Sequence, residues 1–211
     1  MSTDYVFEGN NVSKEHLIKD MMDVKKLERV QSLIKLVPEG KRVLDVGCGF
    51  GVISNLLSKK SDSVIGIDMS RVNIKIAKEF NSATNIIFIC SNAEDLLGVV
   101  PDKFQVVVIA EVIEHVESPY NLLCECYDLL ETGGVLIIST PNAVGKINIL
   151  LNWLKGFRGV EKEERGFGTE TDHIYCWDAR CLLRLCNVCG FKYVNHKFKG
   201  ASILMKVVKN E

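Results

Sequence analysis

Hydrophobic positions along the chain alternate between two spacings: short apolar runs typical of buried strands, and the three-to-four-residue spacing of amphipathic helices. The apolar runs predict strands at residues 42–46, 63–68, 85–90, 104–110 and 135–140. Helical spacing predicts helices between them, over about residues 50–59, 70–80 and 118–130. We expect the last of these helices to stop at Thr132-Gly133-Gly134. Repeated strand–helix units with short connections are typical of a parallel, doubly wound sheet.

The two ends of the chain and one internal segment complete this plan. Apolar spacing over about residues 13–37 predicts an N-terminal helical cap. Residues 141–176 interrupt the strand–helix rhythm, and we interpret them as an insertion or lid. A late helix over about 178–189 is followed by two strand-like runs, 191–198 and 201–208. The sequence therefore predicts a single α/β domain over residues 1–211. Its doubly wound, mostly parallel, seven-stranded Rossmann-like sheet would have helices on both faces and an antiparallel C-terminal edge strand.

A glycine-rich turn follows the first predicted strand, in the sequence Asp45-Val46-Gly47-Cys48-Gly49-Phe50-Gly51. Glycines let the backbone turn tightly and let a ligand approach where a side chain would clash. The turn would lie at the carboxyl end of the strand, the usual ligand crevice of an open α/β sheet. Asp68 closes the second strand, where a carboxylate can accept hydrogen bonds from both hydroxyls of a ribose. The G-x-G-x-G spacing and the Asp45 carboxylate suit a ligand with a cationic amino group and a sulfonium better than a pyrophosphate.

Four strings resemble the successive motifs of class I S-adenosylmethionine-dependent methyltransferases: DVGCGFG (45–51), IGID (65–68), NAEDL (92–96) and EVIEH (111–115). The resemblance is strong over residues 40–140 and looser beyond them. The resemblance implies S-adenosylmethionine as the cofactor. The methionine part would contact Asp45, Gly47, Cys48, Gly49 and Gly51, and the ribose and adenine would contact Asp68 and Met69. Asn92, Ala93 and Glu94 would border the adenine edge, and Glu111 would face the methyl group.

Side chains suited to acceptor chemistry follow the fourth strand and the insertion. Glu111, Glu114 and His115 share one face if their segment turns helical, and His173 follows the insertion. Two carboxylates and two imidazoles suit a divalent ion, which would lower the pKa of a bound hydroxyl. Alternatively, His115 or His173 serves as a metal-free general base, with Glu111 beside the methyl group. In a third interpretation these residues only orient a loop.

The E-x-x-E-H string, together with Ser139-Thr140-Pro141-Asn142 and a later Asp172-His173, is similar to two methyltransferase subfamilies. One comprises O-methyltransferases of the ubiquinone-biosynthesis type, which act on small phenols. The other comprises enzymes that 2′-O-methylate the 3′ end of small RNAs and use two Glu and two His as metal ligands. By that second match, the metal ligands here would be Glu111, Glu114, His115 and His173.

Net charge and cysteine content limit which binding partners and which cellular compartment we expect for this protein. The formal net charge of −1 gives no global positive field, and no basic–aromatic tract is present, so nucleic acid is disfavoured as a partner. We find no secretory signal and no apolar run long enough to span a membrane. The eight cysteines lie mostly in helical or strand-like patterns, which favours free thiols in a reduced cytoplasmic protein.

The sequence therefore predicts an S-adenosylmethionine-dependent methyltransferase that O-methylates a small hydroxylated molecule. Two alternatives stay open: metal-assisted 2′-O-methylation of an RNA 3′ end, and a non-catalytic scaffold that binds an adenosyl ligand. The intact glycines of the turn and Asp68 speak against the scaffold.

Overall fold

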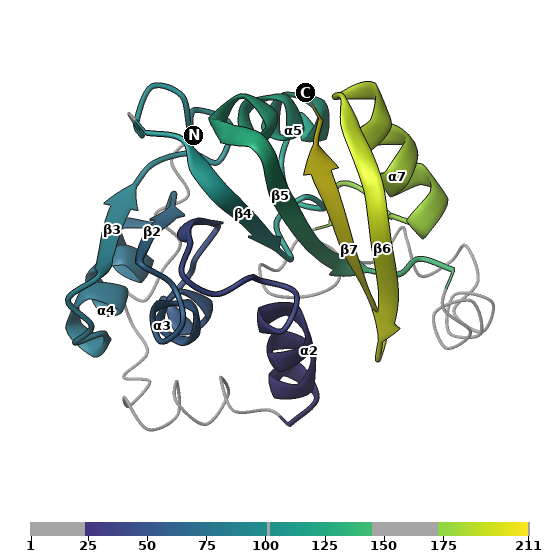
Figure 1. The fold of residues 1–211 in the computed structure, drawn as a ribbon. Helices are drawn as coiled ribbons and strands as arrows, with labels where there is room; N and C mark the ends of the chain where they lie inside the picture. Colours follow the sequence, from purple (N-terminus) through teal and green to yellow (C-terminus); the bar gives the residue numbers. More distant parts are fainter. Residues whose placement is uncertain (1–23, 101, 145–172, 211) are drawn as a thin grey trace.

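A seven-stranded sheet forms the centre of the computed structural model, which describes residues 24–100, 102–144 and 173–210 (Figure 1). The strand order across the sheet is β3-β2-β1-β4-β5-β7-β6. The strands are β1 (Arg42–Val46), β2 (Ser63–Asp68), β3 (Ile86–Cys90), β4 (Phe104–Ala110), β5 (Leu130–Pro141), β6 (Phe191–Lys199) and β7 (Ser202–Lys209). The helices are α2 (Val24–Ile34), α3 (Val52–Ser58), α4 (Arg71–Phe80), α5 (Pro119–Leu129) and α7 (Ala179–Val188).

Strand direction confirms the predicted fold class. The first five strands pair in parallel, and β7 runs antiparallel to both of its neighbours, β5 and β6. One detail differs from the expectation, because the antiparallel strand lies one place inside the edge. The chain reaches the outermost position first, as β6, and a turn at Gly200 brings β7 back against β5.

Helices cover both faces of the sheet, as predicted, and divide the core into two layers. On one face of the sheet, α2 and α3 pack on a hydrophobic cluster that includes Leu57 of α3 and Val43 of β1. On the other face, α5 and α7 pack on a second cluster, which includes Leu122 of α5 and Leu44 of β1. Because side chains alternate along a strand, Asp45 points to the same face as Val43, toward α3. The strand pattern thus places a carboxylate beneath the turn that follows β1.

The junction between α5 and β5 corrects one predicted boundary. The expected helix stop at Thr132-Gly133-Gly134 is wrong, because these residues lie within β5. The strand starts earlier since Leu130 already pairs with Phe104 of β4. The carbonyls at the end of α5 are satisfied from the last strand, where Lys209 Nζ donates to the carbonyl oxygens of Tyr127 and Leu130.

Two other predicted segments are described only in part. The N-terminal helix ends at Ile34 rather than 37, and two overlapping four-residue turns, Leu33 to Leu36 and Ile34 to Val37, follow it. Residues 13–23 of that predicted cap, and residues 145–172 of the predicted lid, lie outside the described residues. Among the helices that are described, none has the length and apolar character needed to cross a membrane.

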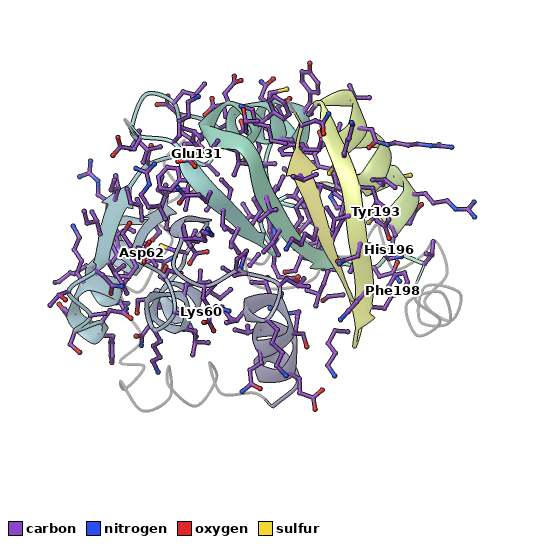
Figure 2. The ribbon with its side chains drawn as sticks, viewed as in Figure 1. Lys60, Asp62, Glu131, Tyr193, His196 and Phe198 are labelled. Carbon is purple, nitrogen blue, oxygen red and sulfur yellow. The ribbon has the colours of Figure 1, made fainter. Side chains whose placement is uncertain are left out.

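Strand β6 carries a row of exposed aromatic side chains, Tyr193, His196 and Phe198 (Figure 2). Tyr193 and His196 share a hydrogen bond of 2.9 Å between the hydroxyl and Nδ1. Exposed Lys192 and Lys197 stand on the same strand. Lysines on an edge strand oppose pairing with another sheet, so this edge is protected by charge.

Replacing Asp178 with alanine should destabilise the protein by about 1–2 kcal/mol, because the side chain caps α7. Its Oδ1 accepts hydrogen bonds from the amides of Arg180 (2.7 Å) and Cys181 (2.9 Å). The bond from the Cys181 amide is the main cause that lowers the pKa of Asp178. A lowered pKa in the folded state means that the cap stabilises at neutral pH and loses its effect as the pH falls through the acid range. Urea denaturation at pH 7 and pH 3 measures this, with Asp178→Asn as the control that keeps an acceptor oxygen. An alanine variant as stable as the wild type at pH 7 would contradict the cap.

Candidate functional site

The turn after β1 is built around three glycines with left-handed backbone, Gly47 (φ 71°), Gly49 (φ 53°) and Gly51 (φ 77°). Residues that carry a side chain rarely adopt such φ values, which is why glycines occupy these positions. Gly51 directly precedes α3, and Cys48 is buried with its amide bonded to the Ile67 carbonyl of β2 (2.8 Å). The turn is therefore attached to β2 as well as to its own strand.

Gly47 and Gly49 differ in what lies beside them. A Cβ at Gly47 would stand 2.2 Å from Val112 Cγ2, so the residue after Glu111 fills the space that Gly47 leaves. A Cβ at Gly49 would meet nothing within 4 Å among the described atoms. The first glycine thus permits contact between two loops of the protein, whereas the second faces open space that a ligand can use.

Asp68, at the end of β2, contacts the glycine turn directly. Its Oδ2 accepts the Gly49 amide at 2.9 Å, and its Oδ1 accepts the Ser70 amide and the Asn73 side chain. This geometry brings the two acidic strand ends, Asp45 and Asp68, to the same edge of the sheet. Ribose binding by Asp68 stays a prediction, and a ribose there would share an oxygen that already holds the turn.

Asp45 is fully buried beneath the turn. Its Oδ2 accepts a 2.6 Å hydrogen bond from Ser54 of α3, while its Oδ1 is buried without a hydrogen-bond partner among the described residues. Burial is the main cause that raises the pKa of Asp45 to about 7, and the nearby charge of Asp68 adds to it. A buried acceptor with an unused oxygen fits the amino group predicted to lie here.

The residues predicted to border the adenine follow β2 and β3. The side chain of Met69 is 60% exposed, and Asn92 Oδ1 accepts the Glu94 amide. Glu94 Oε1 in turn accepts the Ser118 amide (2.8 Å), which links this loop to the start of α5. Ala93 packs at the margin of the core. The Ser91 amide donates to the Asp68 carbonyl (3.1 Å), so the loop after β3 starts next to the end of β2, and its contact with adenine remains a prediction.

The segment after β4 is a turn rather than the helix that would have aligned the two glutamates. Glu111 has φ 56°, the only positive value among described residues other than glycine. Its Oε1 lies 2.5 Å from Arg29 Nη1 of α2 and accepts the Ser139 hydroxyl at 2.9 Å. Glu111 is therefore held by the N-terminal helix and by β5.

Glu114, His115 and His173 do come together, but Glu111 is not among them. One ligand atom from each of the three lies within 4.8 Å of the others. The two imidazole rings meet edge to face at 4.8 Å between centroids, and His115 Nε2 stands 4.0 Å from Glu114 Oε1. Three of the four predicted metal ligands thus lie together among the described residues, whereas Glu111 contacts Arg29, and the four-residue metal set stays a prediction.

Glu114 is the buried member of this three-residue cluster, which we call the acceptor-side cluster. Its side chain is 1% exposed, and its Oε2 accepts the Thr140 hydroxyl at 3.0 Å. Burial, then the charge of Glu111, raises the pKa of Glu114 to about 7. Its carbonyl accepts the amides of Ile174 and Tyr175, which brings the last residues of the predicted lid to the β4 loop.

Sequence reasoning missed Arg29, Ser54, Ser139 and Thr140 as parts of the site. Ser139 and Thr140 end β5 inside the string Ser139-Thr140-Pro141-Asn142, so their position next to the β4 loop could have been read from the strand order. Arg29 offered no such signal, since it lies 110 residues from Ser139 and meets it only through packing of α2.

Comparisons with known proteins agree with the fold described above. A family model described as a methyltransferase domain matches residues 16–196. This chain belongs to the S-adenosylmethionine-dependent methyltransferases. A ubiquinone biosynthesis O-methyltransferase of Pseudomonas entomophila (strain L48) is 34% identical over 113 residues, which are 53% of this chain and 49% of that protein. The chain thus spans about half the length of the curated relatives it matches.

Solved structures share the fold of this methyltransferase at lower identity. Magnesium protoporphyrin IX methyltransferase from Synechocystis PCC 6803, with bound SAH, gives a TM-score of 0.71 at 17% identity and covers 92% of this chain and 87% of its own. The N-methyltransferase NodS from Bradyrhizobium japonicum WM9 gives 0.65 at 15% identity, with 90% and 99% covered. These likenesses establish the fold of the methyltransferase, but they do not identify its acceptor substrate.

Replacing Gly47 with alanine should mainly reduce stability, whereas replacing Gly49 with alanine should mainly reduce ligand affinity. Gly49→Ala has room for its Cβ, so it should cost about 1 kcal/mol of stability and weaken S-adenosylhomocysteine binding at least tenfold. Gly47→Ala displaces Val112 and should destabilise the fold by about 3 kcal/mol or more. Calorimetric titration and thermal unfolding of both variants measure the difference. Unchanged S-adenosylhomocysteine affinity in Gly49→Ala would show that the open space beside Gly49 is not a ligand site, and equal losses of stability in the two variants would contradict the Val112 contact at Gly47.

Asp45→Asn should stabilise the ligand-free methyltransferase while weakening its donor affinity. A carboxyl whose folded pKa is raised from 3.8 to about 7 disfavours folding as the pH rises between those values, because the folded state must then carry a buried charge. The gain over wild type should be near zero below pH 4 and reach about 2–4 kcal/mol above pH 7. Denaturation at pH 4, 6 and 8, with S-adenosylhomocysteine titration at pH 8, measures both effects. A gain that is the same at pH 4 and pH 8 would disprove the buried charge as its cause.

Proposed function

We propose that this protein transfers a methyl group from S-adenosylmethionine to a hydroxyl oxygen of a small molecule. The observation that carries the proposal is the contact of Val112 with Gly47, which seats the β4 loop directly on the glycine turn. Proton-accepting side chains three residues further on therefore lie next to the predicted donor site. The relatives named as O-methyltransferases support the same type of acceptor.

On the donor side, bound S-adenosylmethionine would supply an already activated methyl group. The glycine turn leaves space for the ligand at Gly49, and Asp45 offers an unused oxygen for a cationic amino group. Asp68 supplies hydrogen-bond acceptors for the ribose while it keeps the turn in place. The main task of these residues is alignment, because methyl transfer is an in-line displacement that depends on close positioning.

On the acceptor side, the acceptor-side cluster would remove the hydroxyl proton. An imidazole is well suited to accept a proton near neutral pH, so His115 or His173 would act as the base. Glu114, with its Oε1 4.0 Å from His115 Nε2, would stabilise the imidazolium that results. The same three side chains would hold a divalent ion, which would activate the hydroxyl as a Lewis acid.

The cysteines support a reducing compartment for this reaction. All eight of them lie among the described residues, and all are free thiols. Burial raises the pKa of Cys186 to about 12, so this thiol stays protonated and packs as an apolar side chain in the core. We therefore place the proposed activity in the cytoplasm.

A transfer assay with methyl-labelled S-adenosylmethionine should label phenols or other small hydroxylated molecules in preference to lipids and RNA 3′ ends. His115→Asn should lower kcat about 10²–10⁴-fold, because it removes the proposed base, while S-adenosylhomocysteine affinity changes less than threefold. His196→Asn, on β6 and outside the acceptor-side cluster, is the matched control and should retain full activity. Labelling confined to RNA ends, or to no acceptor class at all, would overturn the proposal.

The same assay separates the metal-free base from metal assistance. Treatment with EDTA should leave the rate within twofold if the imidazole acts alone. Loss of activity with EDTA, restored by Mg²⁺ or Mn²⁺ in the wild type but not in Glu114→Gln, would replace the base with a bound ion.

A further inference from the structure

Three side chains from distant parts of the chain close a triangle at the end of β4. Arg29 Nη1 contacts Glu111 Oε1 at 2.5 Å and donates to Ser139 Oγ at 3.1 Å, and Ser139 Oγ donates to the same Glu111 oxygen at 2.9 Å. The side chains of Arg29 and Glu111 are 17% and 25% exposed, and Ser139 is fully buried. We call this group the Arg29 clamp.

The clamp acts on a residue whose backbone is strained. Glu111 has a left-handed φ of 56°, a conformation that is unfavourable for a residue with a side chain. Its amide also donates to the Ser139 carbonyl at 2.9 Å, so one β5 residue binds both the backbone and the side chain of Glu111. Such a conformation persists only when several contacts enforce it.

The position of Glu111 sets the positions of the residues after it. Val112 fills the space at Gly47, and Glu114 accepts a hydrogen bond from Thr140, the residue next to Ser139. The loop is thus fixed at two consecutive residues of β5, and the Arg29 clamp is the anchor at its beginning. Release of Glu111 would free the loop that carries both Val112 and the acceptor-side cluster.

We propose that Arg29 is a positioning residue for methyl transfer, which holds the β4 loop in its working conformation through Glu111. This inference rests on the proposed function for its kinetic consequence, but the structural consequence stands without an acceptor. It also gives the N-terminal helix α2 a role in the site, because α2 supplies the only cation that contacts Glu111 among the described residues.

The neighbouring residue on the same helix provides a matched control. Glu28 forms an ion pair with Lys199 of β6 at 3.0 Å, and the two side chains are 63% and 41% exposed. This pair also ties α2 to the sheet, but it lies in solvent, where such pairs contribute little. Glu28→Gln should therefore leave the loop and the activity unchanged.

Hydrogen–deuterium exchange of the peptide covering residues 110–116 tests the clamp in Arg29→Gln, Glu111→Gln, the double variant, Arg29→Lys and Glu28→Gln. Arg29→Gln and Glu111→Gln should each speed exchange at least tenfold, and the double variant should exchange no faster than either one. Arg29→Lys should recover part of the protection, because it keeps the charge. Once an acceptor is known, kcat should fall at least tenfold in Arg29→Gln, with KM for S-adenosylmethionine within threefold and the double variant again no worse.

Exchange at the wild-type rate in Arg29→Gln, or effects of Arg29→Gln and Glu111→Gln that simply multiply in the double variant, would overturn the proposal. Faster exchange over the whole chain, with no recovery in Arg29→Lys, would assign Arg29 a general stabilising role and overturn it as well. Failure of the transfer assay to find any acceptor would overturn the proposed function. The exchange experiment would still show whether the Arg29 clamp holds the β4 loop.

Discussion

The site depends on one close contact, Val112 of the β4 loop in the space left by Gly47. A parallel sheet brings the carboxyl ends of neighbouring strands to one edge, but it does not by itself press their loops together. The missing side chain at Gly47 allows that approach. As a result the turn that would face the methyl donor and the loop that would face the acceptor become one surface, and a shift of either displaces the other.

Two buried carboxylates show what this surface costs in stability. Asp45 and Glu114 are each almost fully buried, and in each one an oxygen lacks a hydrogen-bond partner among the described residues. An ionised carboxylate in such a place is unfavourable, which is why burial raises both pKa values toward neutrality. A fold selected for stability alone would place amides or apolar side chains there, so the two carboxylates favour the functional roles proposed for them.

The sequence allowed the conformation of the glycine turn and its neighbouring strands to be predicted because these segments are local, while their contact with the methyl donor stays a prediction. The glycine turn, Asp68 and the strands before them are short segments whose spacing alone indicates their structure, and the fold class followed from the strand–helix rhythm. The acceptor side is not local. Glu111 and Glu114 appeared as one group on a predicted helix, yet their segment is a turn in which each carboxylate has its own partner on β5, Ser139 for Glu111 and Thr140 for Glu114. Arg29 enters from a helix 110 residues away from Ser139. No spacing rule predicts such a contact, since it depends on how α2 packs on the finished sheet.

The backbone of Glu111 connects these observations. Glycine would adopt φ 56° without strain, as it does at the three positions of the turn, but it would carry no carboxylate for Arg29 and Ser139. A side chain retained in a strained conformation implies that its contacts outweigh the strain. Here those contacts join the N-terminal helix, β4 and β5, and they fix the direction in which the chain leaves β4 toward Val112 and Glu114. The strain is therefore the local consequence of holding the β4 loop against the glycine turn and β5.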